Sequence, residues 1–209
     1  MVQLSRQQGT HCCAVILSGG LNTRMGGEIK AFLEVGGNTI LDRLLGVLKP
    51  NFEEILLVTR QPELYSSTPV RVVNDLYDAR SSMTGIHAGL RHAEADFAFV
   101  VPSDMPFLQP ALIKLLLEQL NPRRDIVIPY IDRQYEPLCA IYSKRCIPAI
   151  EAQLNVKDYK ILNFFDKMKV KTLSAEQLKT ADPKLLSFLN INTPAAYSAC
   201  QNLIKEISL

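Results

Sequence analysis

The first eleven residues contain no apolar run, and the chain has no marked excess of charge of either sign. The missing apolar run argues against a secretory signal and a membrane anchor, so we expect residues 1–11 to form a flexible leader. The 23 Lys and Arg residues nearly balance the 21 Asp and Glu residues, which leaves a net charge of +2. A charge balance this even does not favour nucleic acid or an acidic membrane surface as a partner. Any anion must therefore be bound by a local group of residues.

Paired cysteines and closely spaced histidines are also lacking. The five cysteines form no C-x-x-C pair, and an odd number without a secretory segment favours reduced thiols. We therefore expect a cytoplasmic protein. The three histidines have no H-x-x-x-H spacing and no cysteine at ligand spacing, which favours surface or packing roles over metal binding.

The sequence does contain an alternation of strand and helix patterns. With 209 residues, 47% of them hydrophobic, the chain is long enough to bury a large core. The order strand, helix, strand, strand, helix, strand in its first half indicates an α/β fold with a mainly parallel sheet, which we expect as a single domain over residues 12–209. The predicted strands cover residues 12–17, 53–59, 70–75, 96–104, 125–130, 136–143, 170–173 and 188–191, and the predicted helices cover 39–50, 83–93, 109–120, 144–154, 160–168 and 194–206.

The most informative stretch is L-S-G-G-L-N-T-R-M-G-G-E-I-K, which directly follows the first predicted strand. Gly19 and Gly20 allow backbone N–H groups to approach an anion, while Arg24 and Lys30 add positive charge. The spacing fits neither the Walker A loop nor the G-x-G-x-x-G dinucleotide fingerprint. It predicts a phosphate-binding loop of another kind, and the alternative is a plain glycine-rich turn beside solvated basic residues.

A second landmark is V-V-P-S-D-M-P-F, in which an apolar strand ends at Asp104. Open α/β sheets bind ligands at the carboxyl ends of their strands. A carboxylate there suits Mg²⁺, which keeps several waters and bridges to substrate phosphates. The structural alternative is that Asp104 only caps the D-M-P turn.

The loop resembles that of the molybdenum cofactor guanylyltransferases, which runs L-A-G-G-x-S-x-R-M-G-G-x-D-K with the same spacing. Two positions depart from that pattern, because Ser18 replaces an alanine and Ile29 replaces an aspartate, for which Glu28 is a candidate substitute. The segments E-P-L-C-A-I-Y-S and N-I-N-T-P extend the resemblance from Cys13 to the last helix. The matching loop residues are Gly19, Gly20, Arg24, Met25, Gly26, Gly27 and Lys30.

This resemblance implies a Rossmann-like, three-layer nucleotidyltransferase fold and transfer of GMP from GTP to the phosphate of molybdopterin, with Mg²⁺ as cofactor and pyrophosphate as the second product. The acidic residue after the third strand, Asp75, then contacts guanine or ribose, unless it is only a turn residue with Asp78 in its place. Asn192 binds metal or phosphate, unless its turn only starts the last helix. By this resemblance the catalytic residues are Arg24, Lys30 and Asp104, the nucleotide-binding residues are Leu17, Ser18, Gly19, Gly20, Lys30, Asp75, Gly85 and Asp104, and the metal ligands are Asp104 and Asn192.

Two other functions stay open at this point. One is a related nucleotidyltransferase that uses CTP or a sugar phosphate, although the doubled glycine at positions 19 and 20 favours guanylyl transfer. The other is a non-catalytic member that binds nucleotide as a regulatory module. The resemblance also implies contacts with molybdenum cofactor biosynthesis proteins or acceptor molybdoenzymes, and it makes Tyr159 and Lys160 candidates for the pterin side of the site.

Overall fold

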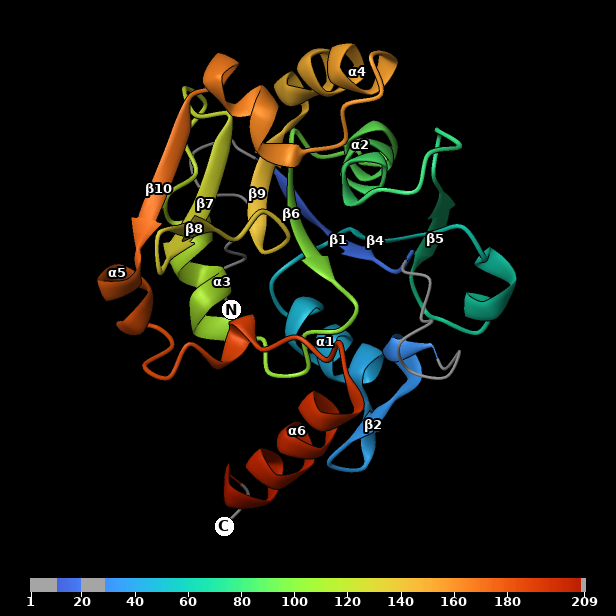
Figure 1. Ribbon diagram of the computed structural model, residues 1–209, viewed down its shortest axis with the longest axis vertical. Coiled ribbons are helices and arrows are strands. Elements are labelled where there is room, and N and C mark those ends of the chain that lie inside the picture. Colours follow the sequence, from blue (N-terminus) through green and yellow to red (C-terminus); the bar gives the residue numbers. More distant parts are fainter. Residues whose placement is uncertain (1–10, 20–28, 208–209) are drawn as a thin grey trace.

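The computed structural model describes residues 11–19 and 29–207. Most of the predicted leader, residues 1–10, and the loop residues 20–28 lie outside this range. Figure 1 shows a central twisted sheet with helices on both of its faces. No helix within the described ranges is both long and apolar enough to cross a membrane.

The first strand, β1 (Cys12–Leu17), shows why the sequence gives a buried sheet. Successive side chains of a strand point to opposite faces, so a strand that is buried on both faces needs apolar residues throughout. Cys12, Ala14 and Ile16 pack into the core on one face, whereas Cys13 and Val15 pack into the core on the other face.

The described residues form one eight-stranded sheet in the order β10-β7-β9-β6-β1-β4-β5, with β8 paired to β7. All neighbours along this order are parallel except at β9, which is antiparallel to both β6 and β7. The predicted mainly parallel sheet is therefore confirmed. The strands after β1 are β4 (Ile55–Thr59), β5 (Arg71–Asn74), β6 (Phe97–Pro102), β7 (Ile126–Ile131), β8 (Gln134–Tyr135), β9 (Ala140–Ser143) and β10 (Val170–Ser174).

Helices cover the sheet in two layers. Leucine and isoleucine side chains of α1 and α3 fill the core on one face, and apolar residues of α2 and α4 fill the core on the other. This is the three-layer arrangement that the family resemblance implies. The α-helices are α1 (Ile40–Leu48), α2 (Ser82–His92), α3 (Pro110–Leu117), α4 (Ile147–Asn155), α5 (Ala175–Lys179) and α6 (Pro194–Ile207), and the 3-10 helices are η3 (Lys30–Phe32), η4 (Pro62–Tyr65), η5 (Lys144–Cys146), η6 (Ile161–Lys167) and η7 (Leu186–Phe188).

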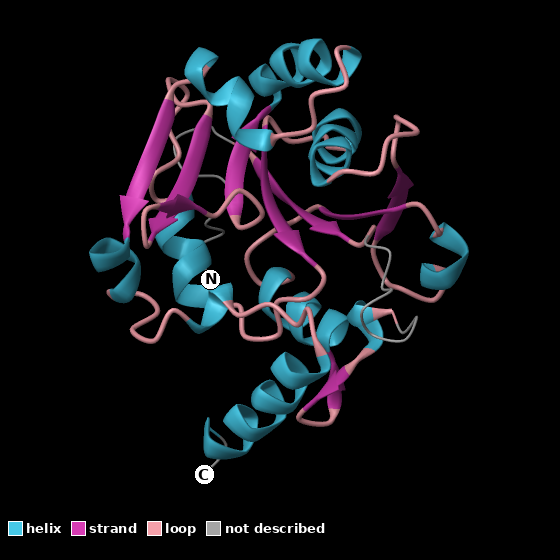
Figure 2. Ribbon diagram, in the orientation of Figure 1, coloured by secondary structure: helices cyan, strands magenta, loops and turns pink. Residues whose placement is uncertain are grey.

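A small β-hairpin and the last helix form a projection beside the main sheet. The hairpin pairs β2 (Glu34–Val35) with β3 (Asn38–Thr39) and leads directly into α1. Tyr197 and Gln201 of α6 both donate side-chain hydrogen bonds to the backbone carbonyl of Glu34. Figure 2 shows this helix lying beside the hairpin.

One predicted strand is wrong. Residues 188–191 form no strand, because the chain turns through η7 and then runs on without a sheet partner. The buried carboxylate of Asp182 causes this turn by accepting hydrogen bonds from the backbone N–H groups of Leu186 and Ser187. The backbone N–H of Ile191 then donates to the carbonyl of Asp104 at 3.0 Å.

Candidate functional site

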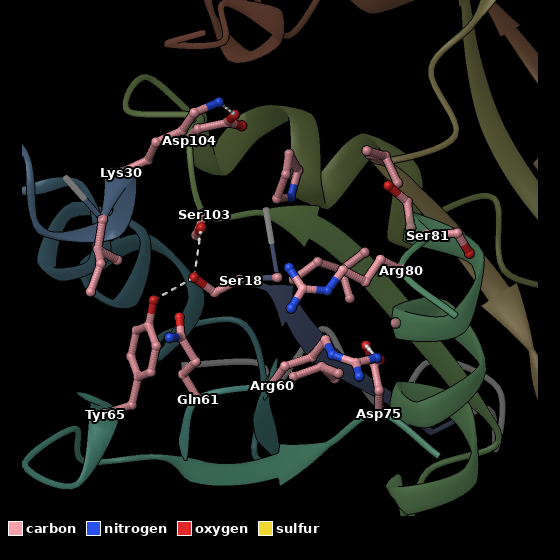
Figure 3. A pocket seen from close by; sticks show the side chains of 18 residues that line it. Ser18, Lys30, Arg60, Gln61, Tyr65, Asp75, Arg80, Ser81, Ser103 and Asp104 are labelled. Atoms are coloured by element: carbon pink, nitrogen blue, oxygen red, sulfur yellow. Dashed lines mark hydrogen bonds and ion pairs between the residues drawn. The ribbon is translucent and has the colours of Figure 1, made fainter. Parts of the chain in front are cut away.

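A cavity of about 330 Å³ lies at the carboxyl ends of β1 and β6. The chain passes from β1 outward through β4 and β5 and then returns to place β6 on the other side of β1. Such a reversal of strand order is where open α/β sheets form their ligand crevices. Figure 3 shows Ser18 between two charged groups, with Lys30 and Asp104 at one end of the cavity and Arg60 and Asp75 at the other.

The first of these ends joins three segments that are distant in the sequence. Lys30 begins η3, Asp104 follows β6, and Asn192 precedes α6. The ammonium of Lys30 lies 2.9 Å from Asp104 Oδ2 and 2.5 Å from Asn192 Oδ1. The backbone hydrogen bond from Ile191 to Asp104 brings the chain before α6 against the end of β6, and so explains how Asn192 reaches this position.

The same end has ligands suited to a divalent cation. Magnesium prefers oxygen ligands and is usually held by one or two carboxylates together with waters and substrate phosphates. Asp104 offers a carboxylate oxygen and Asn192 offers an amide oxygen. The Lys30 ammonium, itself a cation, contacts both of these oxygens. Within the described part of the chain no group of three or more His, Cys, Asp or Glu side chains could hold a metal by itself. A metal bound here would need further ligands, such as waters and the phosphates of a substrate.

The floor of the cavity is a chain of three hydroxyl groups. Ser18 Oγ and Tyr65 Oη share a hydrogen bond of 2.5 Å, and Ser103 Oγ donates to Ser18 Oγ at 3.0 Å. The backbone also holds these residues, because the N–H of Ser18 donates to the carbonyl of Val58 and that of Ser103 donates to the carbonyl of Leu17. Burial raises the pKa of Tyr65, against a smaller opposing effect of the hydrogen bond to Ser18, so its hydroxyl stays protonated at neutral pH.

The opposite end of the cavity has an unsatisfied carboxylate. Asp75 follows β5, and its Oδ1 atom is buried without a hydrogen-bond partner among the described residues. Arg60 Nη1 lies 3.9 Å from the other carboxylate oxygen, but it donates at shorter range to the backbone carbonyls of Tyr77 and Asp78. Burial raises the pKa of Asp75, and the nearby Arg60, Thr84 and His87 offset only part of that effect. A ligand with N–H or O–H donors would satisfy this oxygen.

The first turn of α2 forms another wall of the cavity, with Ser81 and Ser82 among the lining residues. Ser81 caps the helix by accepting a hydrogen bond from the N–H of Thr84. Gly85 lines the cavity too and lies so close to β1 that an added Cβ would be 3.1 Å from Leu17 Cδ2. The small residue therefore brings the helix N-terminus, with its partial positive charge, against the end of β1.

Most of the residues singled out in the sequence converge on this cavity. Asn192 is not among the lining residues but joins the site through Lys30. Gly20 and Arg24 lie outside the described residues, and the pterin candidates Tyr159 and Lys160 do not line the cavity. The predicted residues that line it are Leu17, Ser18, Gly19, Lys30, Asp75, Gly85 and Asp104.

Sequence reasoning missed other lining residues. Arg60 and Gln61 follow β4, and their position after an apolar strand was a usable signal, because ligands gather at strand ends. Tyr65, Arg80 and Ser103 also line the cavity. No local motif marks Tyr65, whose hydroxyl bond to Ser18 depends entirely on the tertiary fold.

Comparisons with known proteins find relatives that match most of the chain. The family model described as a MobA-like NTP transferase domain matches residues 14–171. A molybdenum cofactor guanylyltransferase from Desulfosudis oleivorans is 37% identical over 191 residues, which cover 91% of this chain and 95% of that protein. A probable molybdenum cofactor guanylyltransferase from Natranaerobius thermophilus is 36% identical over 186 residues, which cover 87% of this chain and 90% of that protein.

A solved structure agrees with these relatives. The crystal structure of molybdopterin-guanine dinucleotide biosynthesis protein A from Archaeoglobus fulgidus matches with a TM-score of 0.82 at 29% sequence identity. The match covers 92% of this chain and 98% of that one. The shared fold thus extends over almost the whole of both chains.

Proposed function

The chain belongs to the family of MobA-like NTP transferase domains, and from this premise we propose that it transfers GMP from GTP to the phosphate of molybdopterin. The products are the guanine dinucleotide form of the cofactor and pyrophosphate. The names of the relatives from Desulfosudis and Natranaerobius support this reaction. The observation that carries the proposal is the grouping of Lys30, Asp104 and Asn192 at one end of a cavity whose other end holds the unsatisfied Asp75.

The nucleotide would extend across the cavity with its base or ribose at Asp75. Guanine carries two neighbouring donors, N1–H and the 2-amino group, and ribose carries hydroxyl groups. Either would supply the hydrogen bond that Asp75 Oδ1 does not receive from the described residues. Gly85 lets the first turn of α2 pack against Leu17, which brings the N-terminus of the helix to this side of the cavity.

The triphosphate would lie toward Gly19 and Lys30, with Arg24 and the backbone of Gly20 as further proposed contacts. Ser18 and Leu17 would form the surface beneath it, since both line the cavity at the end of β1. Positive side chains that are already in place when charge develops in the transition state cost little reorganisation. Lys30 would therefore stabilise the negative charge on the departing pyrophosphate.

Asp104 and Asn192 would hold a magnesium ion against the phosphates. When bound, this ion would supply several kcal/mol of charge stabilisation in the transition state. The phosphate of molybdopterin is already an anionic nucleophile, so no residue has to act as a general base. The residues of the chain act by holding the two phosphates in line and by neutralising charge.

We also propose that the reaction takes place in the cytoplasm and that the product passes to cofactor-handling proteins or molybdoenzymes. The five cysteines, all within the described residues, are free and buried, as expected in a reducing compartment. Burial is the largest cause of the raised pKa of each thiol, which argues against a nucleophilic cysteine.

Pyrophosphate release by the purified protein tests the proposal. GTP, CTP and ATP are supplied in separate reactions with magnesium and molybdopterin, and each reaction is repeated without molybdopterin. We expect release that requires GTP and molybdopterin together. A preference for CTP would assign the chain to cytidylyl transfer, and GTP binding without release from any nucleotide would indicate a non-catalytic nucleotide-binding protein.

A further inference from the structure

The ammonium group of Lys30 contacts both of the oxygen atoms that we propose for the metal. Its distances are 2.9 Å to Asp104 Oδ2 and 2.5 Å to Asn192 Oδ1. A lysine ammonium has three N–H donors and no acceptor, so it binds these oxygens in the manner of a small cation. A metal held by these two side chains would therefore either displace the ammonium or lie close enough to be repelled by it.

The contact between Lys30 and Asp104 is partly shielded from solvent. The side chains of Lys30 and Asp104 are only 18% and 15% exposed, so their attraction is stronger than that of a fully hydrated surface pair. Both partners are also held by the backbone. Lys30 begins η3, and its backbone carbonyl accepts a hydrogen bond from the N–H of Leu33. The backbone carbonyl of Asp104 accepts a hydrogen bond from the N–H of Ile191.

We propose that Lys30 competes with the divalent metal for Asp104 and Asn192, and that a nucleoside triphosphate resolves the competition by offering Lys30 phosphate oxygens instead. This inference rests on the proposed function, because it assumes a triphosphate in the same cavity. A triphosphate also brings ligands of its own to the metal. The protein should thus bind metal poorly by itself and well together with nucleotide.

The competition makes the two ligands cooperative. If nucleotide draws Lys30 away from the carboxylate, it raises the affinity for metal, and by thermodynamic linkage metal raises the affinity for nucleotide by the same factor. Lys30 then has two roles at successive stages. It weakens metal binding in the absence of substrate, and it neutralises phosphate charge once substrate is present.

Binding of Mn²⁺, followed by electron paramagnetic resonance, tests this inference without turnover. The wild-type protein and the variants Lys30→Met and Lys30→Gln are titrated with Mn²⁺, with and without a non-hydrolysable GTP analogue. Without nucleotide, we expect both variants to bind Mn²⁺ about 5-fold or more tightly than the wild type, within the usual range of coupling between two sites. The enhancement of Mn²⁺ affinity by the analogue should shrink in both variants.

A matched control separates direct competition from general electrostatics. Arg80 lines the same cavity, and among the described residues it forms no ion pair. Arg80→Met removes one positive charge without freeing Asp104, so it should change Mn²⁺ affinity much less than Lys30→Met. Equal Mn²⁺ affinity in the wild type and in both Lys30 variants would overturn the inference, and so would an equal increase in Arg80→Met.

The experiments distinguish failure of the Lys30 competition from failure of the proposed function. Production of pyrophosphate from GTP and molybdopterin, with unchanged Mn²⁺ affinity in folded Lys30 variants, would leave the function standing and reject the competition. Cooperative binding of Mn²⁺ and the analogue that depends on Lys30, without any pyrophosphate release, would support the competition and reject the function. Undiminished Mn²⁺ binding by Asp104→Asn would reject the metal site and the competition with it.

Discussion

Tyr65 and Ser18 share a hydrogen bond of 2.5 Å across the floor of the cavity, although 47 residues separate them in the sequence. The ring of Tyr65 also stacks on the ring of Phe32, and the ring centroids are 5.2 Å apart. Phe32 belongs to the same 3-10 helix as Lys30. Ser18 in turn accepts a hydrogen bond from Ser103, the neighbour of Asp104. Tyr65 thus connects the segment that carries Lys30 with the strand end that carries Asp104.

Tyr65→Phe removes the hydroxyl and keeps the stacked ring. We expect a loss of about 1 kcal/mol in the free energy of unfolding, the usual value for one intramolecular hydrogen bond, measured by urea denaturation. Ser18→Ala should cost a similar amount, because it leaves the Tyr65 hydroxyl without its partner. The double variant should lose less than the two single losses together, and strict additivity would mean that the two hydroxyls do not interact.

Asp75→Asn should stabilise the protein near neutral pH and weaken GTP binding. Burial raises the pKa of Asp75, so the folded state binds a proton more tightly than the unfolded state does. The ionised carboxylate therefore costs stability as pH rises through the folded pKa, and this cost disappears below the unfolded pKa of about 3.9. We expect a gain of about 1 kcal/mol at pH 7 from removing the buried charge.

Thermal unfolding at a series of pH values measures this effect, and the advantage of Asp75→Asn should shrink as the pH is lowered. Affinity for GTP should fall about tenfold or more, as expected for the loss of a hydrogen bond to a charged group. An unchanged affinity for GTP in calorimetric titrations would place the nucleotide away from Asp75.

Gly89→Ala should destabilise the protein, because an added Cβ would lie 2.6 Å from Val15 Cγ1. Overpacking of this kind typically costs about 1–3 kcal/mol. Gly46 provides a matched control, since it also lies within a helix but has no heavy atom within 4 Å of an added Cβ. Gly46→Ala should stabilise the protein by about 0.5–1 kcal/mol. Equal effects of the two changes in urea denaturation would contradict the close approach of α2 to β1.

Asp104→Ala should reduce turnover far more than Asn192→Ala. Loss of a charged metal ligand removes several kcal/mol of transition-state stabilisation, so we expect kcat to fall about 100-fold or more. Asn192→Ala removes only a neutral ligand, and the waters of a magnesium ion can replace it. Steady-state rates at saturating GTP and magnesium measure both changes, and near-normal turnover by Asp104→Ala would exclude a metal role for this residue.

The strands that carry the site could be predicted from the sequence. The apolar runs of β1 and β6 are buried on both faces of the sheet, so their composition alone identifies them. Ser18 follows β1 directly and Asp104 follows β6 after one further residue, so their place at the ligand edge also follows from the sequence. The convergence of Lys30 with Asp104 required the fold, since 74 residues separate them.

Other features depended on contacts that the sequence does not display. The segment before α6 was expected to include a strand, but the buried Asp182 binds two backbone N–H groups and holds a turn instead. The direction of β9 was not specified by its apolar pattern, which is the same in parallel and antiparallel strands. Helix α5 was missed although Ser174 and Gln177 form a capping box, a signal that is readable in the sequence.

Identification of the product by mass spectrometry is the most direct test of GMP transfer to molybdopterin. The purified protein is incubated with molybdopterin, GTP and magnesium, and the pterin fraction is analysed for a species heavier by one GMP unit. We predict that this dinucleotide forms in amounts equal to the pyrophosphate released, and that it is lost in Asp104→Ala. Release of pyrophosphate without GMP on molybdopterin, or transfer of GMP to another acceptor, would contradict the proposed function.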